Sequence, residues 1–207
     1  MMKLLLLRIM HQKIFNFLLT TAKSQNHLRL YQIIKTIGPI EIPISRLKFQ
    51  HYLIKTIVGQ QISTKAAASI WKKVEAGIKQ HQTSKNKDLQ SILRSCGLSE
   101  RKAQYALGVL DNTQLTSITK KKLKLMQPEI YTAMLLALKG IGPWTVEMSR
   151  IFYLGDEDIF SEGDYGIKAA HTRLFSTEQF SKEFYCKYAP YRTYLSLYLW
   201  RSLDFQI

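Results

Sequence analysis

The chain has 207 residues, nearly half of them apolar, with few glycines and prolines, which favours one domain or two small lobes of helices joined by short turns. Its formal net charge of +15 is uneven: residues 1–128 carry 22 basic and 5 acidic side chains, whereas residues 129–207 carry 8 and 10. Two cysteines, Cys96 and Cys186, exclude a four-thiolate zinc or iron–sulfur site, and no stretch is long and apolar enough to span a bilayer.

The basic excess in residues 1–128 predicts a negatively charged binding partner. A broad basic surface attracts a polyanion, and nucleic acid is the commonest one. Composition leaves open the alternative of a merely soluble, lysine-rich protein. The sparse cysteines fit a reduced, intracellular protein, so we expect it in the cytoplasm.

The N-terminal segment predicts two helices and a loop. The first ten residues are interpreted as an N-terminal extension or the start of an amphipathic helix, because charged residues soon interrupt their apolar run and no signal-peptide cleavage site follows. Apolar stripes predict helices around 14–19 and 28–34, with a helix stop and loop at 37–43.

The next segment predicts two helices separated by an unusual turn. Apolar periodicity favours a helix over about 49–58, and Gly59-Gln60-Gln61 interrupts it. Two glutamines after a glycine, inside an otherwise apolar stretch, are hard to explain as core. Ser63 or Thr64 is expected to cap the helix that follows.

The middle of the chain predicts a loop and two capped helices. Residues 81–88 are polar and basic, which is typical of a loop, and Asp88 is expected to cap a helix that ends at Gly97. Ser99 opens a further helix. The basic run 120–122 is interpreted as solvated surface, with phosphate contact as the alternative.

The most specific local motif is a short turn between two helices, the second of which starts at Pro143. Gly140 and Gly142 flank the apolar Ile141. Glycine permits positive φ angles and close backbone approach, Ile141 can insert into the core, and free N–H groups at a helix start bind anions such as DNA phosphate. An ordinary tight turn remains the alternative.

The C-terminal part carries one notable acid. Asp164 follows Gly163, 22 residues after Gly142, and can cap a helix that begins at Tyr165. The last helix is aromatic-rich and runs from about 191 to 203. No alternating strand pattern persists, so we expect an all-α fold.

The segments GQQIS, LKGIGPWT and the later aspartate occur together and in order, with SERKA and PYRTY as further matches. The chain thereby resembles the helix-hairpin-helix-Gly/Pro-Asp superfamily of DNA glycosylases, in particular its DNA-3-methyladenine glycosylase II branch, over roughly residues 28–204. The resemblance implies two helical lobes with an active-site cleft between them: a terminal lobe of 1–45 and 160–207, and a central lobe of 46–159 whose hairpin spans about 129–153.

The resemblance implies a DNA-repair hydrolase that acts in base excision on alkylated bases, of the 3-methyladenine and 7-methylguanine type. Asp164 matches the catalytic aspartate, and the chemistry is sensible, since breaking a base–sugar bond builds positive charge that a carboxylate stabilises. Trp144 stands where relatives with lyase activity have a lysine, so the enzyme should be monofunctional. Electron-rich Trp144, Tyr165 and Trp200 match base-pocket positions, where an aromatic face suits a cationic base; core packing is the alternative for Tyr165 and Trp200.

The matching DNA-binding positions include Gln61, which would fill the gap left by base flipping, with a helix cap or a backbone hydrogen bond as the alternative. The others belong to the hairpin: Gly140, Ile141, Gly142 and Thr145. We expect double-stranded DNA as partner, a monomer with no membrane association, a nucleoid-associated location and no cofactor; a monovalent cation at the hairpin is left open.

Two departures from the family pattern bear on specificity. Ser161 replaces a usual proline, and Met148 stands where the best-known member of the family has an aromatic. The missing four-cysteine motif argues against thymine-glycol and adenine-mismatch activities. Two alternative functions stay open: a non-catalytic helix-hairpin-helix DNA-binding module, and a glycosylase for deaminated or oxidised bases.

Overall fold

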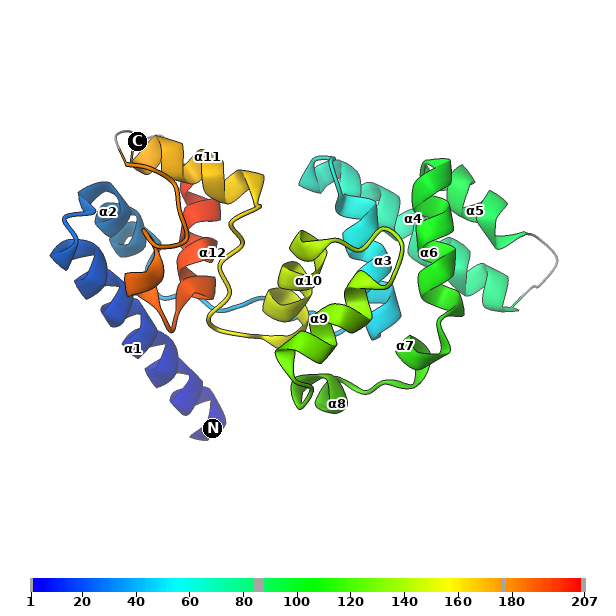
Figure 1. The fold of residues 1–207 in the computed structure, drawn as a ribbon, viewed down its shortest axis with the longest axis horizontal. Helices are drawn as coiled ribbons and strands as arrows, with labels where there is room; N and C mark the ends of the chain where they lie inside the picture. Colours follow the sequence, from blue (N-terminus) through cyan, green and yellow to red (C-terminus); the bar gives the residue numbers. More distant parts are fainter. Residues whose placement is uncertain (1, 84–87, 176–177, 206–207) are drawn as a thin grey trace. The chain divides into compact units, whose positions relative to one another are not determined.

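The computed structural model describes residues 2–83, 88–175 and 178–205. All regular elements in these ranges are helical, which confirms the expected all-α class (Figure 1). The helices are α1 (Met2–Ser24), α2 (Leu28–Ile37), α3 (Phe49–Gly59), α4 (Thr64–Thr83), α5 (Leu89–Ser95), α6 (Glu100–Asp111), α7 (Thr113–Ser117), α8 (Lys120–Lys124), α9 (Pro128–Leu136), α10 (Pro143–Ser149), the π-helical η1 (Arg150–Leu154), α11 (Tyr165–Leu174), the short 3-10 helix η2 (Cys186–Tyr188) and α12 (Arg192–Ser202).

The chain divides into two compact units. The terminal unit consists of Met1–Ile44 and Arg150–Ile207, and the central unit of Ser45–Ser149. We expected the return to the terminal lobe near residue 160, whereas in the structure the preceding ten residues already belong to the terminal unit.

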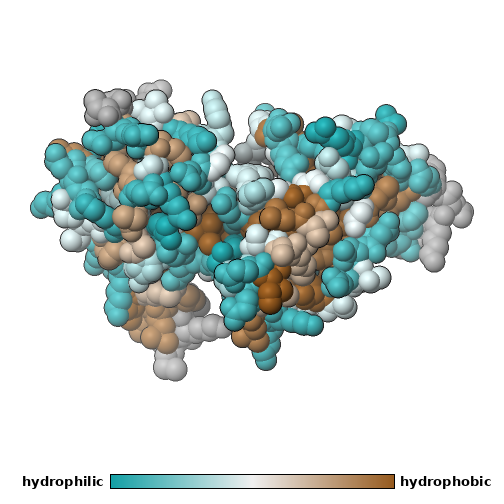
Figure 2. Space-filling view, viewed as in Figure 1, coloured by the Kyte–Doolittle hydropathy of each residue, from teal (hydrophilic) through white to brown (hydrophobic). Residues whose placement is uncertain are grey.

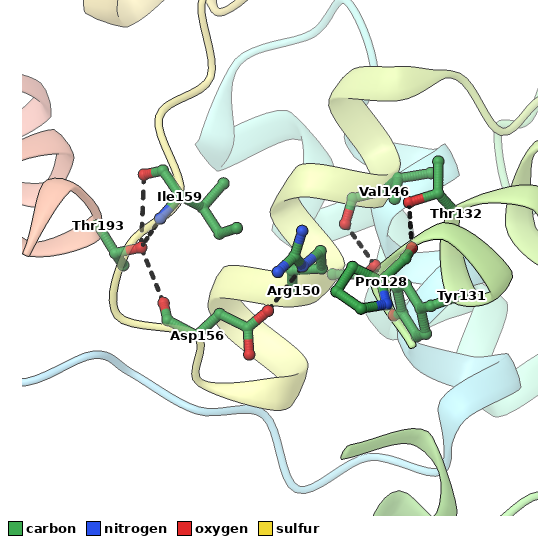
Figure 3. A network of polar contacts seen from close by, with 9 residues as sticks. Pro128, Tyr131, Thr132, Val146, Arg150, Asp156, Ile159 and Thr193 are labelled. Atoms are coloured by element: carbon green, nitrogen blue, oxygen red, sulfur yellow. Dashed lines mark hydrogen bonds and ion pairs between the residues drawn. The ribbon is translucent and has the colours of Figure 1, made fainter. Parts of the chain in front are cut away.

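Hydrogen bonds explain why the segment before residue 160 belongs to the terminal unit. The Thr193 hydroxyl at the start of α12 donates to the Asp156 carbonyl over 2.8 Å and accepts from the Ile159 N–H over 2.9 Å (Figure 3). The Arg192 guanidinium binds the Asp158 carboxylate through two nitrogens, at 2.7 and 2.8 Å. Such pairing lies between residues far apart in the chain, and periodicity does not reveal it.

In the central unit, α3 packs against α4 and α6, and α9 precedes α10 across the short turn. The caps follow the sequence: Asp88 accepts from two N–H groups of α5, Ser99 accepts from one of α6, and Pro128 occupies the first turn of α9. Gly97 has φ +103°, the left-handed conformation expected at a helix end. The core of this unit is mainly aliphatic, and its fully buried members include Leu53, Ile54, Ile57, Val74 and Leu93.

The terminal unit packs α1 against α2 and α11 against α12. Its core is rich in aromatic side chains, and the pKa of each fully buried tyrosine in this unit is raised because burial disfavours the phenolate. These tyrosines are Tyr185, Tyr188 and Tyr198. The His171 residue is also buried, and its ring nitrogen Nδ1 contacts the Tyr185 hydroxyl over 2.8 Å, so this nitrogen takes part in a hydrogen bond within the core.

Three details differ from the sequence expectations or complete them. Helix α1 already begins at Met2, so residues 2–10 form its first part. The expected loop at 81–88 begins later, because α4 runs to Thr83, and 84–87 lie outside the described residues. In the basic run, the Lys120 ammonium donates to the Ser45 carbonyl over 3.1 Å, whereas Lys121 and Lys122 are exposed as expected.

The surface is hydrophilic over much of the face in Figure 2, with hydrophobic side chains gathered in two places. One lies over the first part of α1, where Leu5 and Leu6 are exposed, and the other over α9, where Ile130 is exposed. Among the helices described, none combines the length and the apolar character needed to traverse a bilayer.

Candidate active site and nucleic-acid interface

The turn between α9 and α10 in the central unit adopts a conformation that requires glycine. Gly140 has φ +85°, and a Cβ there would overlap the Tyr105 ring. Ile141 is 6% exposed, so the expected insertion of this residue into the core is confirmed. A Cβ added at Gly142 would meet no atom within 4 Å, so the backbone of this residue faces open space.

Thr145, in the first turn of α10, belongs to the interior rather than to an exposed binding face. Its side chain is 1% exposed, and its hydroxyl accepts from the Gln60 amide over 3.3 Å. An anion at this helix start would therefore meet the backbone N–H groups and not the Thr145 hydroxyl.

In the Gly59-Gln60-Gln61 turn, one glutamine side chain is directed inward and the other is exposed. The Gln60 amide points inward and donates to the Gly140 carbonyl over 3.0 Å, which ties the turn to the hairpin. Gln61 is exposed and has φ +60°, a left-handed conformation that is costly for any residue with a Cβ. Both glutamines are unusual in the sequence, but only the structure shows that Gln60 is directed inward and Gln61 is exposed.

Lys102 on α6 also reaches this turn, a contact that sequence reasoning missed. Its ammonium donates to the carbonyls of Val58 and Gln60, at 2.9 and 2.8 Å. Partial burial lowers the pKa of Lys102. The only available signal was its place in the SERKA segment.

Two further residues of α10 that the sequence singled out differ in their exposure. Trp144 is partly exposed, and Met148 is buried. The Met148 carbonyl accepts from the Tyr52 hydroxyl over 2.8 Å, and burial raises the pKa of Tyr52. The Ser149 hydroxyl contacts the Tyr131 hydroxyl over 2.7 Å, which anchors the end of α10 on α9.

In the terminal unit, Asp164 is held at the start of α11 by two donors. The same carboxylate oxygen accepts from the Ile167 N–H and from the Trp200 indole N–H, each over 2.8 Å. The first contact confirms the expected N-cap. With the Asp164 residue only 7% exposed, both contacts fix the carboxylate in a desolvated setting.

The surroundings of Asp164 show why this geometry is possible. A Cβ at Gly166 would lie 2.8 Å from the Trp200 ring, so only glycine admits the indole at this distance from the helix. The Trp200 ring also packs near Phe152, with ring centroids 5.7 Å apart. Ser161 is fully buried, and its carbonyl accepts from the Asp164 N–H over 3.1 Å, which closes a tight turn in place of the missing proline.

Tyr165 lies next to Asp164 in the chain and is 85% exposed. The core-packing alternative is therefore wrong for Tyr165, whereas Trp200 is partly buried and engaged with Asp164. A desolvated, oriented carboxylate can stabilise a developing cation or orient a water molecule. Over the described part of the chain, no group of three or more His, Cys, Asp or Glu side chains could hold a metal ion.

Comparison with known proteins gives consistent matches. A family model described as "HhH-GPD superfamily base excision DNA repair protein" matches residues 54–185. DNA-3-methyladenine glycosylase 1 of Schizosaccharomyces pombe is 28% identical over 83% of this chain and 80% of its own length.

Two solved structures resemble the fold. The DNA-3-methyladenine glycosidase of Bacillus halodurans matches at a TM-score of 0.68 and 32% identity, over 88% of this chain and 87% of that one. The S. pombe 3-methyladenine DNA glycosylase in complex with abasic DNA has a TM-score of 0.71 at 24% identity, over 88% and 97% of the two chains.

Proposed function

The chain belongs to the HhH-GPD superfamily of base excision DNA repair proteins, and we propose that it is a monofunctional DNA glycosylase that hydrolyses the N-glycosidic bond of alkylated purines in double-stranded DNA. The observation that carries the proposal is the buried Asp164 carboxylate, held by the start of α11 and by Trp200. The relatives named for 3-methyladenine removal support the substrate class.

The reaction makes a specific demand on the protein. As the base leaves, positive charge develops on the sugar, and a fixed carboxylate stabilises it and orients the attacking water. A purine alkylated on a ring nitrogen is already cationic and leaves readily, so strong acid assistance is not needed. Asp164 therefore suffices as the main charged catalytic residue of this proposal.

The central unit would hold the DNA. Backbone N–H groups at the start of α10, beside Gly142, would bind a phosphate without reading sequence. Gln61 would enter the space left by the flipped base, since its side chain is exposed on a left-handed turn. Trp144 and Tyr165 are proposed to contact the base, and Trp200 to act mainly by orienting Asp164.

The product follows from the residue at position 144. Tryptophan is not a nucleophile, so no imine with the sugar forms and the strand stays intact after the base has left. We further propose that the enzyme works as a monomer without a resident cofactor, with a monovalent cation at the hairpin as the one candidate ion.

The test is base release from duplexes that each hold one lesion: 3-methyladenine, 7-methylguanine, 1,N6-ethenoadenine, hypoxanthine, uracil or 8-oxoguanine. We expect release of the methylated purines, strand breaks only after alkali, and no adduct after borohydride. Binding without release would point to a non-catalytic module, and preferential release of hypoxanthine, uracil or 8-oxoguanine to the other glycosylase class. A strong trapped adduct would refute the monofunctional assignment.

A further inference from the structure

Helix α3 ends at a turn whose carbonyl groups need partners from outside the helix. The last carbonyls of an α-helix have no N–H donor within it and carry the negative end of the helix dipole. Lys102 supplies the missing donor, with its ammonium 2.9 Å from the Val58 carbonyl and 2.8 Å from the Gln60 carbonyl. One side chain thus joins the end of α3 to the middle of the turn.

Lys102 is fixed at both of its ends. Its backbone N–H donates to the Ser99 hydroxyl that caps α6, and its ammonium is bound as described. Lys102 is partly buried, so water is partly excluded from its ammonium, and this burial lowers the pKa of Lys102. A lysine kept only to attract phosphate would extend into solvent, as the exposed Lys121 does.

The turn that Lys102 closes carries two exceptional features. The Gln60 amide donates to the Gly140 carbonyl, and Gln61 has a left-handed backbone conformation and an exposed side chain. Such a backbone persists only where the surroundings over-determine it. The hydrogen bonds on Gln60, from Lys102 to its carbonyl and from its amide to the hairpin, supply that constraint.

Resting on the function proposed above, we propose that Lys102 is a positioning residue for base flipping. It locks the 59–61 turn so that the Gln61 side chain is presented to the duplex in fixed register with the hairpin backbone. Without the ammonium, the Val58 and Gln60 carbonyls turn to water, and Gln61 relaxes from its left-handed conformation. Filling the gap then requires ordering the turn at each encounter, which slows flipping.

The experiment compares two duplexes that differ only in the cost of flipping. Each holds one 7-methylguanine, opposite cytosine or opposite an abasic analogue, because an unpaired base is cheaper to extrude. Single-turnover base release is measured for wild type, Lys102→Met, Lys102→Arg, Gln61→Ala and the double variant Lys102→Met with Gln61→Ala. Lys121→Met is the control for loss of one positive charge.

We expect Lys102→Met to slow release from the paired duplex about tenfold and from the unpaired duplex less than about threefold. Lys102→Arg, which keeps a cationic donor, should recover most of the rate. The double variant should be no slower than Gln61→Ala alone, because both changes act through one side chain. Equal loss on the two duplexes, full additivity with Gln61→Ala, or behaviour like Lys121→Met would overturn the role.

Amide hydrogen exchange gives a readout that does not depend on activity. Lys102→Met should accelerate exchange at residues 59–63, and Lys121→Met should not; unchanged exchange refutes the locking role even if base release is absent. Wild-type protein that releases no base from either duplex refutes the proposed function instead. If Lys102→Met does not fold, the neutral Lys102→Gln variant is measured on the same duplexes, with the same criteria.

Discussion

The two units differ in charge and in the way they fix their functional groups. The central unit has 17 basic and 6 acidic residues, a net charge of +11, whereas the terminal unit has 13 and 9, a net charge of +4. In the central unit the proposed functional groups lie mainly on the backbone of two turns, and hydrogen bonds from the Gln60 and Lys102 side chains to backbone carbonyls hold these turns in place. The terminal unit fixes one carboxylate, Asp164, beside an indole and next to an aromatic-rich core.

This difference suggests a division of labour between binding and chemistry. Phosphate is recognised by many weak contacts that need exposed donors and positive charge, whereas a catalytic carboxylate needs a rigid, partly desolvated place. Changes around Asp164 should therefore alter the rate of base release, and changes at the hairpin backbone of the central unit should alter duplex affinity. Substitutions in each unit test this division.

The largest effect is expected for Asp164→Asn. Asparagine can still accept from the Ile167 and Trp200 N–H groups, so the cap and the fold should survive. The negative charge is lost, and single-turnover base release should fall at least about a hundredfold, while duplex affinity stays the same or rises. Glu162→Gln, a neighbouring exposed acid, is the control and should retain activity. Near-normal release by Asp164→Asn would remove this residue from the mechanism.

The second prediction separates the two hairpin glycines. Gly140→Ala should lower the free energy of unfolding by about 2–3 kcal/mol, because a Cβ would sit on the Tyr105 ring with φ at +85°. Gly142→Ala should leave stability unchanged, since its Cβ would point into open space, yet weaken duplex binding by obstructing phosphate. Urea unfolding and salt-dependent duplex titrations measure both. Equal stability of the two variants would show that the turn is not strained as described.

The third prediction compares one tryptophan from each unit. Trp200→Phe removes the indole N–H that donates to Asp164 and should lower kcat about tenfold, the usual scale for one hydrogen bond to a charged group, with little change in KM. Trp144→Phe should instead raise KM, because its proposed role is contact with the base. Steady-state kinetics on one methylated duplex distinguish the two. A kcat loss in Trp144→Phe with none in Trp200→Phe would reverse the proposed roles.

The smallest effect concerns a contact that serves structure alone. Hydrogen bonds from the Arg192 guanidinium, and a further one from its backbone N–H, lower the pKa of the Asp158 carboxyl below its ordinary value of 3.8. A carboxyl with a lowered folded pKa contributes stability that is complete above the ordinary value and is lost as pH falls through the lowered one. Asp158→Asn should cost about 1 kcal/mol of unfolding free energy at neutral pH, and the difference from wild type should shrink in acid. A difference that persists undiminished in strong acid would assign the stability to packing instead.

Much of the local structure could be predicted from the sequence. The caps at Asp88, Ser99 and Asp164, and the turn around Ile141, depend on hydrogen bonds and dihedral preferences within a few residues. The short helices α7 and α8 were missed, because a single helical turn carries too few apolar positions to show a period. The extra residues of α4 were missed for a related reason, since polar composition alone suggested a loop.

What the sequence by itself determined is therefore the helical class, the hairpin, the family resemblance and the identity of the capping acid. Only the tertiary structure decided which glutamine points outward, that the Thr145 hydroxyl faces the interior, and that Trp200 is a second donor to Asp164. The Trp200 contact to Asp164 spans 36 residues and the Lys102 contact to Gln60 spans 42. Contacts at such separations are set by how the apolar faces of whole helices pack, so they depend on many residues at once and leave no local mark in the sequence.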